Sequence, residues 1–145
     1  MPSTCHDAPP GAAETVTFPC NFAEGRAASR RLCDFLARQG VSQTDLFACE
    51  LALTEACNNA VQHVGAAGRS QSITARAACN ASEIELSVVD HTDGFDWPTV
   101  PLEAPSPEAE HGRGVFIIRS IMRRAEYVAG QGQNTLTMWR PRTAE

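Results

Sequence analysis

Residues 46–64 read LFACELALTEACNNAVQHV, and this stretch decides the fold. At about 100° per residue, its apolar side chains recur on one side of a helix. Glu55 lies roughly opposite that side, and Asn59, one helical turn later, shares the face of Glu55. The apolar seam consists of Leu46, Leu53, Cys57 and Val64. We therefore predict a helix from Ser42 or Thr44 to Val64 that carries a carboxylate and a carboxamide together, away from its core side.

The polar face of this helix has two interpretations. A pair such as Glu55 and Asn59 is often only a solvated helix surface. The neighbouring asparagines Asn58 and Asn59 weaken that interpretation, because asparagine is a poor helix former and both stand inside the helical pattern. His63 lies near the same face and is either an ordinary histidine at a helix end or part of a site.

A second stretch with polar groups follows a strand pattern. Residues 84–90, IELSVVD, alternate apolar and polar side chains and end on Asp90. The chain then enters a turn that contains Gly94 and Phe95. An aspartate at a strand end before a glycine turn is a common binding position, and it is equally typical of a simple turn.

A third stretch places Gly112, Arg113 and Gly114 directly before an apolar helix pattern. Glycine lets the chain approach a ligand closely. The start of a helix offers free backbone N–H groups to phosphate oxygens. Alone, this motif also fits a loop hinge.

The remaining pattern predicts an α+β layered sandwich, because runs of strands are separated by helices. Asn21 is expected to cap the first helix and Gly40 to end it. Helices are expected at 21–39, 42–64 and 114–123, and strands at 14–20, 69–79, 83–90, 125–129 and 134–140. We expect a flexible leader at 1–13 and a single domain at 14–142.

The segment 91–113 has no periodicity and is rich in proline. We expect it to be a lid that closes over a bound ligand, since long segments of this kind are usually functional or disordered. The alternative is an insertion without fixed structure.

The three motifs, in this order, resemble the GHKL ATP-binding fold and, within it, the anti-sigma-factor serine/threonine kinases. The N-box matches TEACNNAVQH (54–63), the first glycine box DHTDGFD (90–96) and the second GRGVFIIRSIM (112–122). Glu55 carries the assignment to the subfamily, because histidine kinases of this fold usually have asparagine there. The resemblance implies a two-layer sandwich of a mixed, mostly antiparallel sheet with three main helices on one face.

The resemblance also implies roles for individual residues. Glu55 would be the catalytic base toward a serine hydroxyl, Asn59 would bind Mg²⁺, and Asp90 would accept the adenine amine of ATP. The other nucleotide-binding residues that it implies are Asn58, His63, Gly94, Phe95, Gly112, Arg113, Gly114, Val115, Phe116 and Thr135.

The expected partners are an anti-sigma-factor antagonist, which would be phosphorylated, and a sigma factor, which would be sequestered; a homodimer is also implied. The chain departs from the family pattern at Thr92, in place of a glycine, and at Arg123 and Arg124, in place of two acids. These departures keep open an alternative, a non-catalytic ATP-binding module that acts by partner binding.

The composition excludes several other classes of protein. All 12 basic residues are arginines, so a Walker A loop and Schiff-base chemistry are excluded. A net charge of −5 argues against a nucleic-acid-binding face. The sequence shows no apolar run of about 18 residues and no signal peptide, so we expect a cytoplasmic protein without a membrane span. The six cysteines form no metal or redox motif and are expected to be reduced thiols.

Overall fold

The computed structural model describes residues 11–62, 71–91, 113–130 and 132–143, which form three helices and five strands. The helices are α1 (Phe22–Arg38), α2 (Gln43–Gln62) and α3 (Arg113–Ile121). The strands are β1 (Ala12–Pro19), β2 (Ser72–Cys79), β3 (Glu83–Asp90), β4 (Arg124–Gly130) and β5 (Gln133–Pro141). Each element lies within a few residues of the range expected from the sequence.

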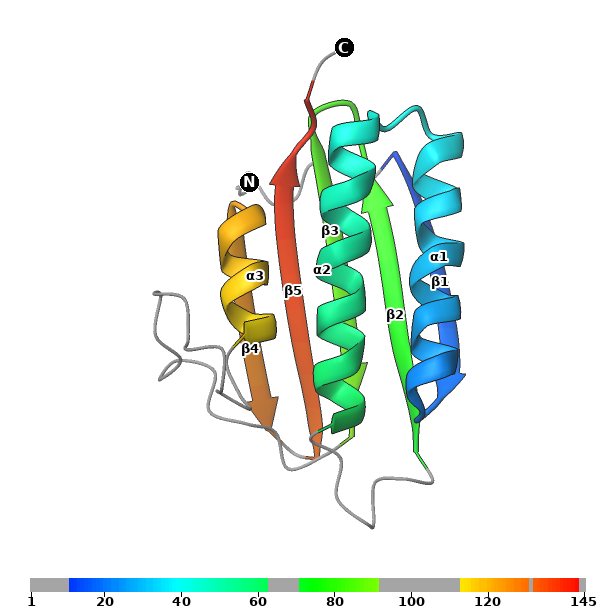
Figure 1. The fold of residues 1–145 in the computed structure, drawn as a ribbon, viewed down its shortest axis with the longest axis vertical. Coiled ribbons are helices and arrows are strands. Elements are labelled where there is room, and N and C mark those ends of the chain that lie inside the picture. The colour runs from blue at the N-terminus through cyan, green and yellow to red at the C-terminus, as the bar shows by residue number, and fades with distance from the viewer. Residues whose placement is uncertain (1–10, 63–70, 92–112, 131, 144–145) are drawn as a thin grey trace, which may run out of the picture.

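The five strands form one sheet in the order β1-β2-β3-β5-β4, and all three helices cover the same face of it (Figure 1). The predicted α+β two-layer sandwich is confirmed. The expected mixed pairing is not found, since every neighbouring pair of described strands is antiparallel. The reason is that the β4–β5 hairpin places β5 between β3 and β4, which separates the two strands that run in the same direction.

Local sequence signals explain both ends of α1. The side chain of Asn21 accepts a hydrogen bond from the backbone N–H of Glu24 at 2.8 Å, as expected of an N-cap. Gly40, just beyond the last turn, has a φ of +83°, a backbone conformation that glycine adopts without steric cost. Both capping predictions are confirmed.

The central helix α2 is buried more widely than its apolar seam predicts. Leu53 and Cys57 are fully buried, Leu46 is half-buried, and Val64 lies outside the described residues. Besides Asp45, Cys49 and Val61, the additional buried positions are alanines: Ala48, Ala52, Ala56 and Ala60. These small side chains let α1 and α3 pack along the two sides of α2 while the sheet covers a third (Figure 1).

The described cysteines are all free thiols, and four of the five are buried. Burial raises the pKa of the Cys33 and Cys49 thiols to about 12, so both stay protonated at neutral pH. A protonated thiol is a poor nucleophile and a poor metal ligand. These two cysteines therefore act as small apolar side chains in the core.

None of the described helices is both long enough and apolar enough to cross a bilayer.

Candidate functional site

The polar face of α2 lies against α3. Glu55 and Asn59 are half-buried, and the nearest part of α3 is Gly114, the second residue of that helix. A Cβ atom built on Gly114 would lie 2.8 Å from Glu55 Oε1 and 3.3 Å from Asn59 Oδ1. A side chain at this position would displace the end of Glu55, so the polar face of α2 packs closely against α3 instead of facing open solvent alone.

This contact joins two of the sequence motifs at one point. Because α2 and α3 run antiparallel, the start of α3 meets the second half of α2 (Figure 1). The first turn of any helix carries backbone N–H groups without partners inside the helix. The structure therefore brings together a carboxylate, a carboxamide and a helix N-terminus, which is an arrangement suited to phosphate and to a hard cation.

Two side-chain atoms of the asparagine pair are buried and have no hydrogen-bond partner among the described residues. They are Asn58 Oδ1 and Asn59 Nδ2. Buried polar atoms are nearly always paired, so unpaired ones are expected where a ligand or water completes the structure. Because the two ends of an asparagine amide are assigned rather than observed, Asn59 can present either atom to a ligand.

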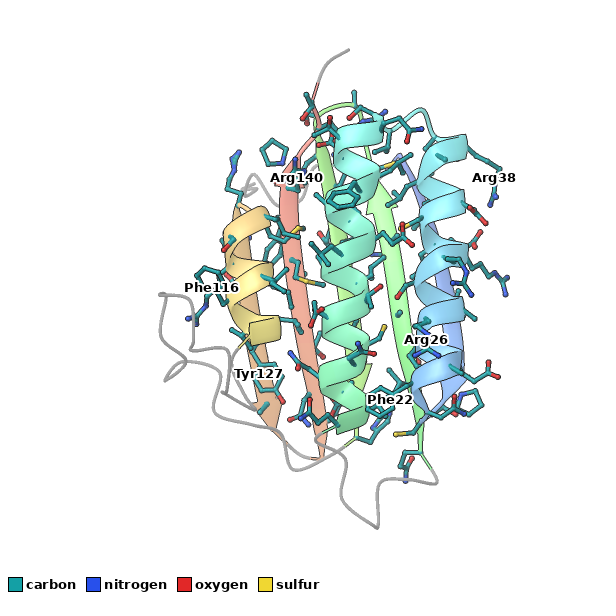
Figure 2. All side chains as sticks on the ribbon, in the orientation of Figure 1. Phe22, Arg26, Arg38, Phe116, Tyr127 and Arg140 are labelled. Carbon is teal, nitrogen blue, oxygen red and sulfur yellow. The ribbon has the colours of Figure 1, made fainter. Side chains whose placement is uncertain are left out.

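The residues that follow Gly114 have structural surroundings as well. Val115 is buried, and Phe116 is half-buried on the side of α3 that faces away from α2 (Figure 2). Arg113 is the first residue of α3. The predicted sites His63, Gly94, Phe95 and Gly112 lie outside the described residues, as does the predicted lid at 91–113 apart from its two end residues.

Asp90 occupies the last position of β3, on the face that the helices cover. It is 6% exposed, and its Oδ1 accepts a hydrogen bond of 2.8 Å from Nδ2 of Asn134, which is 2% exposed. The two residues are direct cross-strand partners in the β3–β5 register. Asp90 thus presents an oriented carboxylate at the edge of the core.

Thr135, which the resemblance implied as a nucleotide-binding residue, does not share the face of Asp90. It pairs with Val89, so it lies on the opposite face of the sheet, where it lines a hollow of about 400 Å³ at the β4–β5 hairpin. Successive side chains of a strand point to opposite faces, and a shift of one residue therefore exchanges the faces. The buried Leu136 and Met138 lie in phase with Asn134, and this signal was available in the sequence.

The two arginines that depart from the family pattern have different surroundings. The Arg124 guanidinium lies 4.0 Å from the centre of the Trp139 ring and 3.7 Å from Glu126. Trp139 in turn donates a hydrogen bond to Glu85 at 3.1 Å. Arg123 is exposed. Arg124 therefore packs on the outer face of the sheet with its side chain partly exposed, whereas Arg123 lies in the exposed turn between α3 and β4.

Comparison with known proteins gives a consistent assignment. A family model described as Histidine kinase-like ATPase domain matches residues 18–140. The chain is 27% identical to a serine-protein kinase RsbW of Bacillus licheniformis over 99 residues, which cover 63% of this chain and 62% of the relative. It is 26% identical to the serine-protein kinase RsbW of Bacillus subtilis over 94 residues, or 59% of each. The chain thus spans about three fifths of the length of these relatives.

Solved structures share the fold. The RsbU and RsbW domains of Rv1364c from Mycobacterium tuberculosis superimpose with a TM-score of 0.68 at 22% identity, over 93% of this chain and 34% of that one. The SiaB–SiaC complex from Pseudomonas aeruginosa gives a TM-score of 0.62 at 12% identity, over 88% and 89%. With the family match over most of its length, the chain belongs to the Histidine kinase-like ATPase domain family.

Proposed function

We propose that this chain is an ATP-dependent serine/threonine protein kinase that phosphorylates an anti-sigma-factor antagonist, sequesters a sigma factor, or does both. The observation that carries the proposal is the contact of Gly114 with Glu55 and Asn59, which unites the N-box and the second glycine box. The similarity to serine-protein kinases RsbW supports the same reaction class.

Asp90 and Asn134 would select the base. The Asn134 amide orients the Asp90 carboxylate through the 2.8 Å hydrogen bond. The carboxylate would then accept a hydrogen bond from the exocyclic amine of adenine. Guanine presents a carbonyl oxygen at that position, and two acceptors facing each other repel. The pair therefore favours ATP over GTP.

The start of α3 would hold the phosphates. Its unpaired N–H groups and the positive end of the helix dipole attract phosphate oxygens, and Arg113 would add a guanidinium. The side-chain oxygen of Asn59, together with the triphosphate, fits Mg²⁺, and the metal would neutralise phosphate charge. His63, Gly94, Phe95 and Gly112 remain proposed contacts.

Glu55 would serve as the general base. As the serine hydroxyl oxygen of the antagonist bonds to the γ-phosphorus, the bond from that phosphorus to the β–γ bridging oxygen breaks. ADP carries away the electron pair of the broken bond, and Glu55 accepts the hydroxyl proton. The half-buried position beside Gly114 holds the carboxylate close to the start of α3.

The exposed Arg123 at the turn between α3 and β4 favours a second candidate, a non-catalytic ATP-binding module that acts by partner binding. The kinase and the non-catalytic module differ in one measurable respect, because only a kinase transfers the γ-phosphoryl group.

We further propose that the protein works in the cytoplasm.

The wild-type protein is expected to bind Mg·ATP in the micromolar range and to bind GTP much more weakly. It is also expected to label a small antagonist-type domain from the same genome on a serine or threonine. Calorimetric titration with ATP, ADP and GTP measures nucleotide binding. Incubation with radiolabelled ATP measures labelling of the antagonist-type domain. If the protein binds ATP but labels no antagonist-type domain, its function is that of the non-catalytic ATP-binding module. Equal heats for ATP and GTP would refute base selection by Asp90.

Gly114→Ala is expected to lower the rate of phosphoryl transfer by at least about tenfold, since a misplacement of about 1 Å can cost up to ~10²-fold. The new Cβ would displace Glu55 Oε1, which lies 2.8 Å from its position. The free energy of unfolding should fall little, because the displaced atom ends a flexible side chain and alanine favours the helix.

The matched control for this variant is Gly130→Ala, since a Cβ at Gly130 would meet nothing within 4 Å. Single-turnover labelling and thermal unfolding are measured on both variants. Full transfer activity in Gly114→Ala would show that this close approach is not part of the catalytic geometry.

A further inference from the structure

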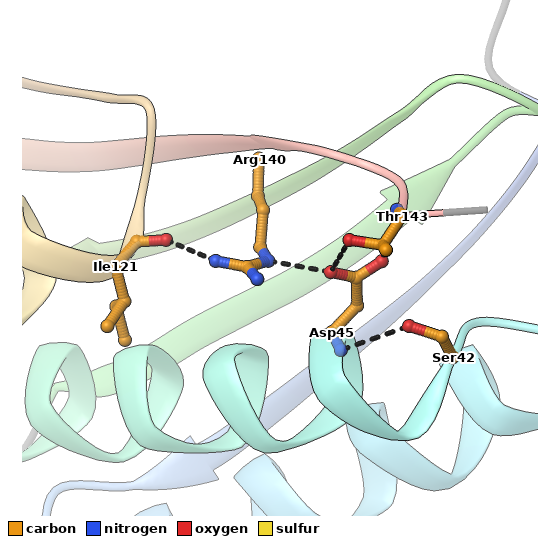
Figure 3. A network of polar contacts seen from close by, with 5 residues as sticks. All are labelled: Ser42, Asp45, Ile121, Arg140 and Thr143. Carbon is orange, nitrogen blue, oxygen red and sulfur yellow. Dashed lines mark hydrogen bonds and ion pairs between the residues drawn. The ribbon is translucent and has the colours of Figure 1, made fainter. Parts of the chain in front are cut away.

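Arg140 links three elements (Figure 3) and lies near the end of β5, whereas Asn134, the partner of Asp90, lies near its start. From β5, its Nε donates a hydrogen bond to Asp45 Oδ1 on α2 at 2.8 Å, and its Nη1 donates to the backbone carbonyl oxygen of Ile121 at 2.6 Å. Asp45 also accepts hydrogen bonds from the Thr143 backbone N–H at 2.6 Å and from its hydroxyl at 2.9 Å. A single guanidinium thus joins α2, α3 and β5.

The Asp45 carboxylate is ionised in this network. Its side chain is fully buried, while that of Arg140 is 19% exposed. Burial alone would raise the pKa of Asp45, but the hydrogen bonds from Thr143 and Arg140 outweigh it and lower the pKa below 3.8. A buried ion pair of this kind is costly to break on one side, because the remaining charge stays buried without its partner.

Ile121 is the last residue of α3, so its carbonyl oxygen has no acceptor role inside the helix. Arg140 satisfies it and places positive charge at the negative end of the helix dipole. The helix has only nine residues, and a helix this short depends on tertiary contacts for its stability. Arg140 holds the C-terminal end of α3, and the contact of Gly114 with α2 holds its N-terminal end.

We propose that Arg140, oriented by Asp45, is a positioning residue for the nucleotide site. By fixing the C-terminal end of α3 against α2, it sets where the N–H groups at the start of α3 lie relative to Glu55 and Asn59. The consequence for ATP rests on the proposed function, whereas the effect on α3 itself does not.

The test is Arg140→Lys, which keeps the charge but cannot donate to Asp45 and Ile121 in the same fork geometry. Amide hydrogen exchange in α3 should accelerate about tenfold or more, the size expected for loss of one charge-assisted hydrogen bond, while exchange in α1 stays unchanged. The dissociation constant of Mg·ATP should rise by a similar factor of about ten. The matched control is Arg142→Lys, since Arg142 donates to the carbonyl oxygens of Asn80 and Gln39 rather than to Ile121.

Unchanged exchange in α3 overturns the proposal, and so does equal acceleration in α1 and α3, which would mean that the pair stabilises the whole fold. If Arg140→Lys does not fold, Asp45→Asn decides instead, because it removes the charge that orients Arg140 and preserves the shape of the side chain. If the wild type binds no ATP, the proposed function fails, while the comparison of α3 with α1 still decides whether Arg140 positions that helix.

Discussion

Glu55→Gln is expected to slow phosphoryl transfer by about 10²–10⁴-fold, the range over which a general base contributes. Glutamine has the shape of glutamate, so the contact with Gly114 is kept and Mg·ATP affinity should hardly change. What is lost is the acceptor for the hydroxyl proton of the substrate. Single-turnover transfer from radiolabelled ATP, measured beside calorimetric ATP binding, separates the two effects.

Glu50→Gln is the matched control, because Glu50 lies on the same helix and is exposed, whereas the side chains nearest to Gly114 are those of Glu55 and Asn59. It should transfer phosphate like the wild type. Equal labelling by Glu55→Gln and wild type would show that Glu55 is not the base. Loss of nucleotide binding in Glu55→Gln would instead assign the residue to binding.

Asp90→Asn is expected to weaken ATP binding by about 10²–10³-fold, as when a buried polar site loses its matched partner. The single amide oxygen of an asparagine there would accept from Asn134 as Asp90 does now. Its NH₂ group would then face the adenine amine, donor against donor. The preference for ATP over GTP should shrink or reverse, since guanine offers an acceptor. Calorimetric titration with both nucleotides measures this.

Two neighbouring variants test which residue of β5 belongs to the site. Asn134→Ala should weaken ATP binding, because it removes the donor that orients Asp90. Thr135→Ala should leave ATP binding unchanged, because Thr135 lies on the other face of the sheet. An equal loss of affinity in both variants would contradict the face assignment, and a loss in Thr135→Ala alone would reverse it.

Local signals in the sequence were sufficient for the helices and strands and for the positions of three polar residues of the candidate site. The caps of α1, the alternation in β3 and the polar face of α2 each depend on neighbours within a few residues. Such preferences are set by side-chain direction and by capping groups close along the chain. They placed Glu55 and Asn59 on one helix face and Asp90 at a strand end, and the structure agrees on all three.

By itself, then, the sequence determined which helices and strands form and which residues carry the polar groups of the site. Only the tertiary structure decided which of them meet. Gly114 lies against Glu55, and Asn134 rather than Thr135 pairs with Asp90. Arg140 binds Asp45, which is 95 residues away in the chain, and Ile121, which is 19 residues away. The physical reason is that these contacts depend on strand register and on how closely helices pack. Both are set by burial of the whole core. A short window of sequence shows which face a residue takes, as for Asn134, but not which distant residue it meets.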